Sequence, residues 1–139
     1  MSRQNKDMPA VSGKQITNVK KISATVGVAD FTDGGSTAGT YALTELIPKG
    51  ARVIGCNVEV TAAFAGDTSA VLVVGDGSDV DRYNTGTPSI FAAAASVNMG
   101  VPSGAVHHGA AATPTLTVTS GLDFGAISGG RLILEILYV

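Results

Sequence analysis

Apolar and polar residues alternate with a period of two over much of the chain. The clearest case is the stretch ARVIGCNVEVTAAF, residues 51–64, in which one parity is almost entirely apolar. That parity comprises Ile54, Cys56, Val58, Val60, Ala62 and Phe64. A period of two places one set of side chains on the buried face of a strand and the other set toward solvent. We therefore predict a long strand over 51–64 that buries this parity.

Further segments indicate strands by the same pattern. Alternation predicts strands at 21–29, 40–47 and 114–121, with inward parities that comprise Ile22, Ala24, Val26 and Val28, then Tyr41, Leu43 and Ile47, then Leu116 and Val118. Continuous apolar runs at 69–75 and 131–139 predict strands that are covered on both sides, in the core or at a subunit interface. Residues 89–100 are rich in alanine, which suits a helix, but Gly and Pro lie close on both sides, so we predict a strand there as well.

Segments rich in Gly, Ser, Thr and Asp separate these strands, as is typical of tight turns. Short strands at regular spacing with glycine-rich turns predict an all-β fold, an antiparallel β-sandwich of jelly-roll type. The chain of 139 residues fits one domain. We assign residues 16–139 to this domain and residues 1–15 to an extended N-terminal arm.

Charge is unevenly distributed along the chain. Residues 1–21 hold five cations against the single acid Asp7, a local charge of +4, while four basic and ten acidic residues give the remainder −6. The cations are Arg3, Lys6, Lys14, Lys20 and Lys21. A basic arm on an acidic body indicates a partner-binding segment. The cations are too scattered, and too far from any aromatic residue, to predict direct binding of nucleic acid.

The cysteine content and the hydropathy of the chain indicate the cellular compartment in which it is made. The single Cys56 excludes an intramolecular disulfide, and its place on the apolar parity predicts a core residue. The first residues lack the apolar segment of a secretory signal, and no run approaches the length of a membrane span. We expect a chain made in a cytosol, with no membrane partner.

The stretch VLVVGDGSDVDRY places three acids, Asp76, Asp79 and Asp81, just after an apolar run. Clustered carboxylates can bind Ca²⁺, but neither register that starts at Asp76 or Asp79 supplies the sixth-position glycine and twelfth-position glutamate of an EF-hand loop. The three acids stay weak candidates for an irregular ion site. The favoured interpretation is a turn, in which Gly75 and Gly77 allow positive φ and the Asp side chains bond to nearby backbone.

Other candidates for chemistry are few. His107 and His108 are adjacent, so on a strand they would face opposite ways, and we interpret them as a loop pair. The sequence contains no P-loop, dinucleotide-binding or nucleophile-elbow motif. We therefore predict a protein that binds or builds rather than an enzyme, without a cofactor.

Three segments together carry a family resemblance: ELIPKGARVIGCNVEVTAAF, AVLVVGDGSDVDRYNTG and LTVTSGLDFGAISGGRLILEILYV. Over residues 40–85 and 113–139 the chain resembles the cement, or decoration, proteins of short-tailed bacteriophage heads. The resemblance implies a jelly-roll fold and a non-enzymatic virion protein, assembled in the host bacterial cytoplasm and carried on the outside of the head. It further implies a homodimer or other small oligomer that bridges major capsid protein subunits against internal DNA pressure. The basic arm would contact an acidic capsid surface.

Two alternatives stay open at this stage. One is a receptor- or carbohydrate-binding module of a phage tail or fibre that holds its ligand in loops 76–90 and 100–114. The low aromatic content, with no Trp, argues against it because sugar sites favour aromatic platforms. The other is a hydrolase or calcium-dependent protein that uses Asp76, Asp79 and Asp81.

Overall fold

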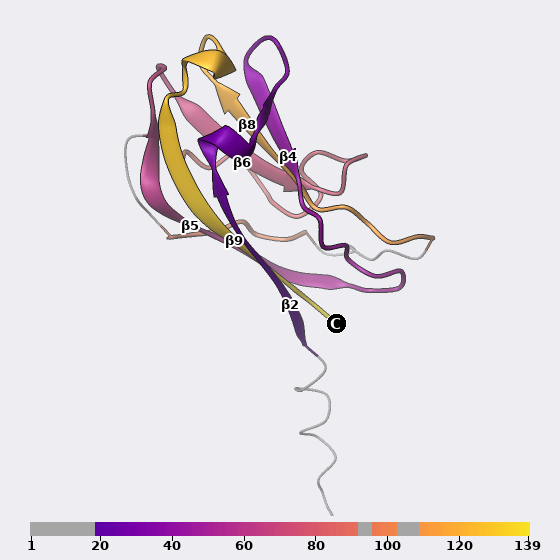
Figure 1. Ribbon diagram of the computed structural model, residues 1–139. Helices are drawn as coiled ribbons and strands as arrows, with labels where there is room; N and C mark the ends of the chain where they lie inside the picture. The colour runs from indigo at the N-terminus through magenta and orange to yellow at the C-terminus, as the bar shows by residue number, and fades with distance from the viewer. Residues whose placement is uncertain (1–18, 92–95, 103–108) are drawn as a thin grey trace, which may run out of the picture.

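The computed structural model describes residues 19–91, 96–102 and 109–139, which form two four-stranded sheets (Figure 1). The first sheet has the strand order β2-β9-β5-β7 and the second β3-β4-β8-β6, and all named pairs are antiparallel. The strands are β2 Lys20–Gly27, β3 Thr32–Asp33, β4 Ala38–Ala42, β5 Val53–Ala65, β6 Ala70–Gly75, β7 Ser96–Asn98, β8 Thr115–Ser120 and β9 Gly129–Tyr138. Two short 3₁₀ turns, η1 Val28–Asp30 and η2 Phe124–Ala126, connect strands. The predicted all-β antiparallel sandwich is confirmed.

Alternation predicted most of the inward residues of the segments 21–29, 40–47 and 114–121 correctly. The buried ones are Ile22, Val26, Leu43, Ile47, Leu116 and Val118, whereas Ala24, Val28 and Tyr41 are only partly buried. Two of the strands end earlier than predicted, β2 at Gly27 and β4 at Ala42, so Leu43 and Ile47 lie beyond β4. In β8 the threonines between the buried residues are partly exposed, as a period of two requires. These faces meet inward-facing side chains of the other sheet in one core cluster.

The long strand β5 confirms four of the six residues predicted to face inward and contradicts the other two. Cys56, Val58, Val60 and Phe64 are buried as predicted, but Ile54 is 49% exposed and Val53 is buried in its place. Ala62 is also exposed. The register against β9 shifts between Val53 and Gly55 and again after Val60, and an extra residue at a β-bulge moves the following side chains to the opposite face.

The two continuous apolar strands are covered mainly on one face. In β6, Leu72 and Val74 are buried whereas Val71 and Val73 are partly exposed, and in β9 the buried residues are Leu132, Leu134 and Ile136. The prediction of coverage on both sides was therefore wrong for the single chain, because each sheet has only one partner sheet.

The ambiguous segment 89–100 is extended at both described ends. Ser89 and Phe91 form isolated bridges with Val71 and Phe64, and β7 pairs with β5. Residues 92–95 lie outside the described residues, so the strand prediction is confirmed only at its ends.

An aromatic cluster fills one end of the core. Phe31 lies 5.9 to 6.4 Å, between ring centroids, from Tyr41, Phe64 and Phe124. The Phe124 ring packs directly on Gly39, where an added Cβ would come within 2.4 Å of the ring. Glycine at this position therefore lets an aromatic ring pack against the backbone of β4.

Candidate interaction surfaces

The outer face of the sheet β3-β4-β8-β6 carries no charged side chain at its outward strand positions. Registers and burial place the following residues on this face: Thr32, Ala38, Thr40, Ala42, Val71, Val73, Thr115, Thr117 and Thr119. Thr117 lies at the centre, between Thr40 and Val73. We call this set the uncharged face. A partner that covers it would not have to desolvate an ion, and interface cores are depleted in charged residues.

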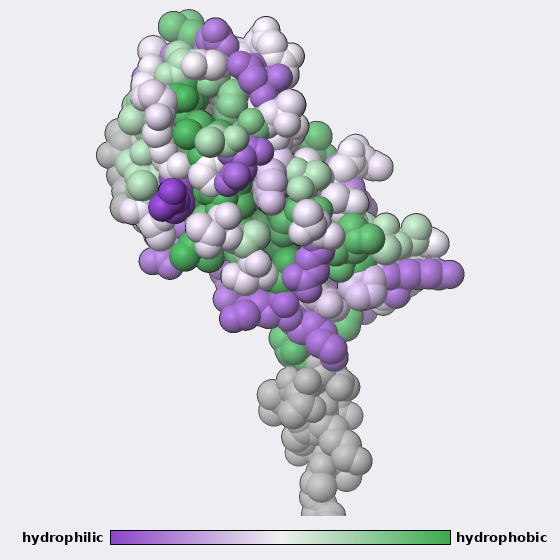
Figure 2. Space-filling view, in the orientation of Figure 1, coloured by the Kyte–Doolittle hydropathy of each residue, from purple (hydrophilic) through white to green (hydrophobic). Residues whose placement is uncertain are grey.

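The outer face of the sheet β2-β9-β5-β7 differs because charges lie among its apolar side chains. Lys21 Nζ lies 3.5 Å from Glu135 Oε2; the Lys21 side chain is exposed and the Glu135 side chain is partly exposed. Ile133 and Leu137 alternate with Glu135 along β9 and are partly buried. Figure 2 shows hydrophilic and hydrophobic residues intermixed on the visible side of the molecule. We call the outer face of the sheet β2-β9-β5-β7 the charged face.

A shallow hollow of about 480 Å³ lies on the charged face beside β7. None of its lining residues is aromatic, and its polar lining comes from Asn57, Glu59, Ser96, Asn98 and Glu135. An aromatic platform would support the carbohydrate-binding alternative, and the lining of this hollow does not include one.

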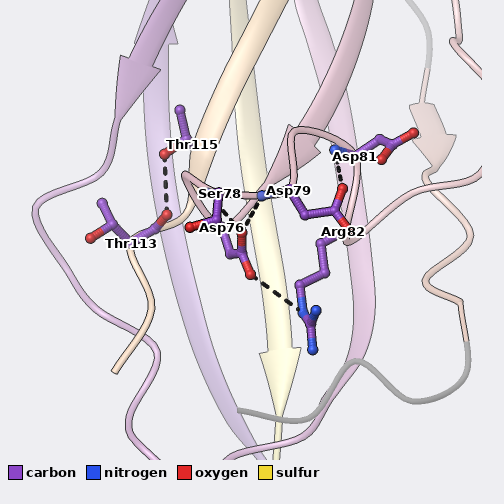
Figure 3. A network of polar contacts seen from close by, with 7 residues as sticks. All are labelled: Asp76, Ser78, Asp79, Asp81, Arg82, Thr113 and Thr115. Atoms are coloured by element: carbon purple, nitrogen blue, oxygen red, sulfur yellow. Dashed lines mark hydrogen bonds and ion pairs between the residues drawn. The ribbon is translucent and has the colours of Figure 1, made fainter. Parts of the chain in front are cut away.

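The acidic stretch after β6 folds into a tight turn (Figure 3). Asp76 Oδ1 accepts hydrogen bonds from the backbone N–H groups of Ser78 at 3.0 Å and Asp79 at 2.7 Å. Asp76 Oδ2 lies 3.5 Å from Nε of Arg82. The carboxylate thus serves the backbone of its own turn and a neighbouring cation, as the turn interpretation expects.

The other two acids of the stretch lie differently. Asp79 Oδ1 accepts a hydrogen bond of 3.4 Å from the backbone of Asp81, whose carboxylate points away from Asp76 in Figure 3. The hydrogen bond with the Asp79 side chain, followed by burial and the Asp79 charge, raises the pKa of Asp81. Within residues 19–91, 96–102 and 109–139, no three His, Cys, Asp or Glu side chains are grouped so as to hold a metal ion.

A buried asparagine closes this turn against β6. Asn84 is 3% exposed, and its Oδ1 accepts a hydrogen bond of 2.8 Å from the backbone N–H of Val74. Its Nδ2 donates to the carbonyl of Gly86 at 2.7 Å. Beside it Tyr83 is fully buried, and burial, with a smaller effect of the Asp76 charge, raises its pKa. Sequence reasoning missed the role of Asn84.

A second carboxylate links two loops at one end of the sandwich. Asp67 Oδ2 accepts hydrogen bonds from the backbone N–H groups of Leu122 at 2.9 Å and Asp123 at 3.0 Å. These bonds, that of Asp123 first, lower the pKa of Asp67. Asp123 in turn caps η2 by accepting from Gly125 N–H at 3.0 Å. No local sequence signal identified this contact.

The remaining predicted residues fall into two groups. Cys56 is fully buried, which confirms it as a core residue, and burial raises the pKa of its thiol to about 12. Of the basic residues, Lys20 and Lys21 begin β2, whereas Arg3, Lys6 and Lys14 lie outside the described residues. The same holds for His107 and His108.

These features define a β-sandwich whose two outer faces differ in charge and whose best-defined polar contacts hold turns together. Among solved structures, one similar chain belongs to the capsid asymmetric unit of cyanophage Pam1, with a TM-score of 0.62 and 20% sequence identity. The alignment covers 87% of this chain and 84% of that chain. At this identity the likeness shows a shared fold.

Comparison by sequence adds nothing to the structural likeness, since no protein-family model and no curated protein matches the chain. In the part of the chain that the structure describes, no helix has the length and apolar character needed to cross a membrane.

Proposed function

We propose that this chain is a non-enzymatic structural protein of a bacteriophage virion. More specifically, it is a cement protein on the outside of the head that bridges major capsid protein subunits and stabilises them against internal DNA pressure. The observation that carries this proposal is the fold shared with a chain of the cyanophage Pam1 capsid asymmetric unit over 87% of the sequence. The sequence resemblance to cement proteins of short-tailed phages supports the same role.

The strand order supports the jelly-roll part of the prediction. β9, the last strand, lies between β2 and β5, and β8 lies between β4 and β6. Late strands that insert between early ones in both sheets are typical of the paired Greek keys of a jelly roll. Jelly rolls of this kind are common in capsid proteins.

We assign the uncharged face to the capsid contact. It is a continuous surface of threonine, valine and alanine across β3, β4, β8 and β6, and a lattice partner would bury it without unpaired ions. The basic residues Arg3, Lys6 and Lys14 would add contacts with an acidic capsid surface.

The experiment is reconstitution of phage heads that lack this protein. Purified chain should bind these heads at a fixed lattice position in cryo-electron microscopy, and bound heads should resist heating or osmotic shock better than bare heads. Heads that do not bind the chain, or bare heads that are equally robust, contradict the cement role. A major band in purified virions is expected of a cement protein, and a minor band is expected of a fibre tip.

Matched variants test the assignment of the face. Thr117→Arg places a cation at the centre of the uncharged face and should lower head binding by at least about tenfold, the effect of a poorly compensated charge in an interface. Thr61→Arg places the same residue at an exposed position of β5 in the other sheet and should leave binding unchanged. Equal binding by both variants would contradict the assignment while leaving the cement role standing.

A further inference from the structure

The strand β2 is a long, regular sheet edge. All eight residues pair with β9 without a register shift, and β2 stands at the end of its sheet with no described strand on its other side. In Figure 1 it runs along β9 as the outermost strand of its sheet. An edge of this length presents a row of backbone N–H and C=O groups that can pair with another chain.

The other edges of the described sandwich are short or covered. β3 has two residues and β7 has three. The edge of β6 is covered by residues 88–90, because Leu72 N–H donates to the Pro88 carbonyl and Ile90 N–H donates to the Ala70 carbonyl, both at 3.0 Å. Among the strands that the structure describes, β2 alone keeps a long edge of the kind that natural proteins usually blunt with proline, bulges or charges.

We propose that β2 pairs antiparallel with β2 of a second copy of this chain. Antiparallel pairing that keeps inward residues inward allows two central registers, one with Ser23 opposite Ser23 and one with Ala24 opposite Ala24. In the second register Ile22 lies opposite Val26, and Ser23 lies opposite Thr25. Ala24, which is partly exposed at the edge of the core, would then be covered by its counterpart.

For a second copy, the charges of β2 favour the antiparallel over the parallel orientation. Its cations, Lys20 and Lys21, both lie at the first end of the strand, and the remaining residues of β2 are uncharged. In the two central registers, Lys21 of one copy lies about 13–20 Å along the strand from Lys21 of the other, at 3.2–3.4 Å per residue. That separation exceeds the Debye length of about 8 Å at physiological ionic strength, so the two ends do not repel strongly. A parallel arrangement would bring the cations together.

The first experiment measures the mass of the full chain in solution. Analytical ultracentrifugation over a concentration series should show a monomer–dimer equilibrium for the wild type. The variant Ser23→Lys with Thr25→Lys changes two exposed side chains and places lysines opposite one another in either register. We expect its dimer dissociation constant to rise by at least about tenfold, because like charges directly opposite destabilise a strand pair.

The matched control adds the same two charges at the opposite edge of the same sheet. Ser96→Lys with Asn98→Lys alters two exposed residues of β7 with the same spacing and should leave the dimer unchanged. A wild type that is monomeric or trimeric would overturn the proposal. A β2 variant that dimerises as tightly as the wild type would overturn it too, and so would a β7 variant whose dimer is weakened as much as that of the β2 variant. Circular dichroism checks that all variants are folded.

A cross-link tests the geometry directly. Paired residues on antiparallel strands have Cα atoms about 4.5–5.5 Å apart, within the range that a disulfide spans. Ser23→Cys with Thr25→Cys should therefore give a disulfide-linked dimer under mild oxidation in either register, and Cys56 does not compete because it is fully buried. The corresponding variant Ser96→Cys with Asn98→Cys should stay monomeric on a non-reducing gel. Failure of the β2 cysteines to cross-link would overturn the antiparallel pairing. This inference rests on the edge alone, so it can fail while the capsid role stands.

Discussion

Replacing Asp76 tests whether the acidic stretch is a structural turn. The Asp76 side chain is only 13% exposed and accepts two backbone hydrogen bonds, at 2.7 and 3.0 Å, besides lying 3.5 Å from Nε of Arg82. Hydrogen bonds to charged groups each contribute about 1.5–3 kcal/mol. The turn amides are solvent-exposed, so water would replace part of what Asp76→Ala removes. We expect a net loss of about 2–4 kcal/mol in the free energy of unfolding.

Two further substitutions separate the turn from an ion site. Asp76→Asn keeps an oxygen that can accept from both amides but removes the charge beside Arg82, so it should cost about half as much as Asp76→Ala. Asp81→Asn should not lower the free energy of unfolding, because the pKa of Asp81 is raised by its hydrogen bond with the Asp79 side chain and by the Asp79 charge, so the charged carboxylate is disfavoured in the folded state. An irregular calcium site would instead make all three acids important.

Urea unfolding followed by circular dichroism measures these differences. With a slope near 2 kcal/mol per molar urea, Asp76→Ala should lower the midpoint by about 1–2 M. The wild-type midpoint should be the same with and without a chelator. An Asp81→Asn variant as unstable as Asp76→Ala, or a wild type that a chelator destabilises, would refute the turn interpretation.

Three shorter predictions address the core and the loops. Because the pKa of Asp67 is lowered in the folded state, its carboxylate stabilises the fold at pH values above the unfolded pKa of about 3.9. This stabilisation is lost as the pH falls through the folded-state pKa. The free energy of unfolding of Asp67→Asn, measured over the same pH range, should lack this loss. The Cys56 thiol should not react with a thiol reagent at pH 8 in the folded protein and should react fully in denaturant, since it is buried with a pKa of about 12. Gly39→Ala should cost about 1–3 kcal/mol in thermal or urea unfolding because its Cβ would overlap the Phe124 ring, whereas Gly129→Ala, with open space around it, should not.

Much of the fold could be predicted from the sequence because burial follows a period of two. β8 is the simplest example, since Leu116 and Val118 alternate with threonines and face the core as the pattern indicates. The bulges of β5 could not be predicted in the same way. Val53 and Ile54 are equally apolar, so composition does not decide which of them faces inward, and the register against β9 decides it.

Among the polar contacts, the local ones could be predicted from the sequence and the long-range ones could not. The turn after β6 was predicted because Asp and Gly act on their own neighbours within three residues. The bond from Val74 to Asn84 and the bonds from Leu122 and Asp123 to Asp67 span larger separations, 55 and 56 residues in the second case. Such contacts depend on tertiary packing, and one sequence contains no local pattern that specifies them.

The two proposed surfaces, the uncharged face and the edge of β2, were inferred independently, but together they fix how a dimer would meet a capsid. Antiparallel pairing of β2 with its copy would place a two-fold axis normal to the shared sheet, near Ser23 or Ala24. A rotation about that axis keeps each outer face on its own side, so both uncharged faces would point the same way and both charged faces the other. A dimer would then present two copies of the capsid-binding surface to one lattice at a fixed separation. Linked contacts of this kind can strengthen binding by 10²–10⁴-fold without any new interaction, which suits a protein whose individual face offers only threonine, valine and alanine.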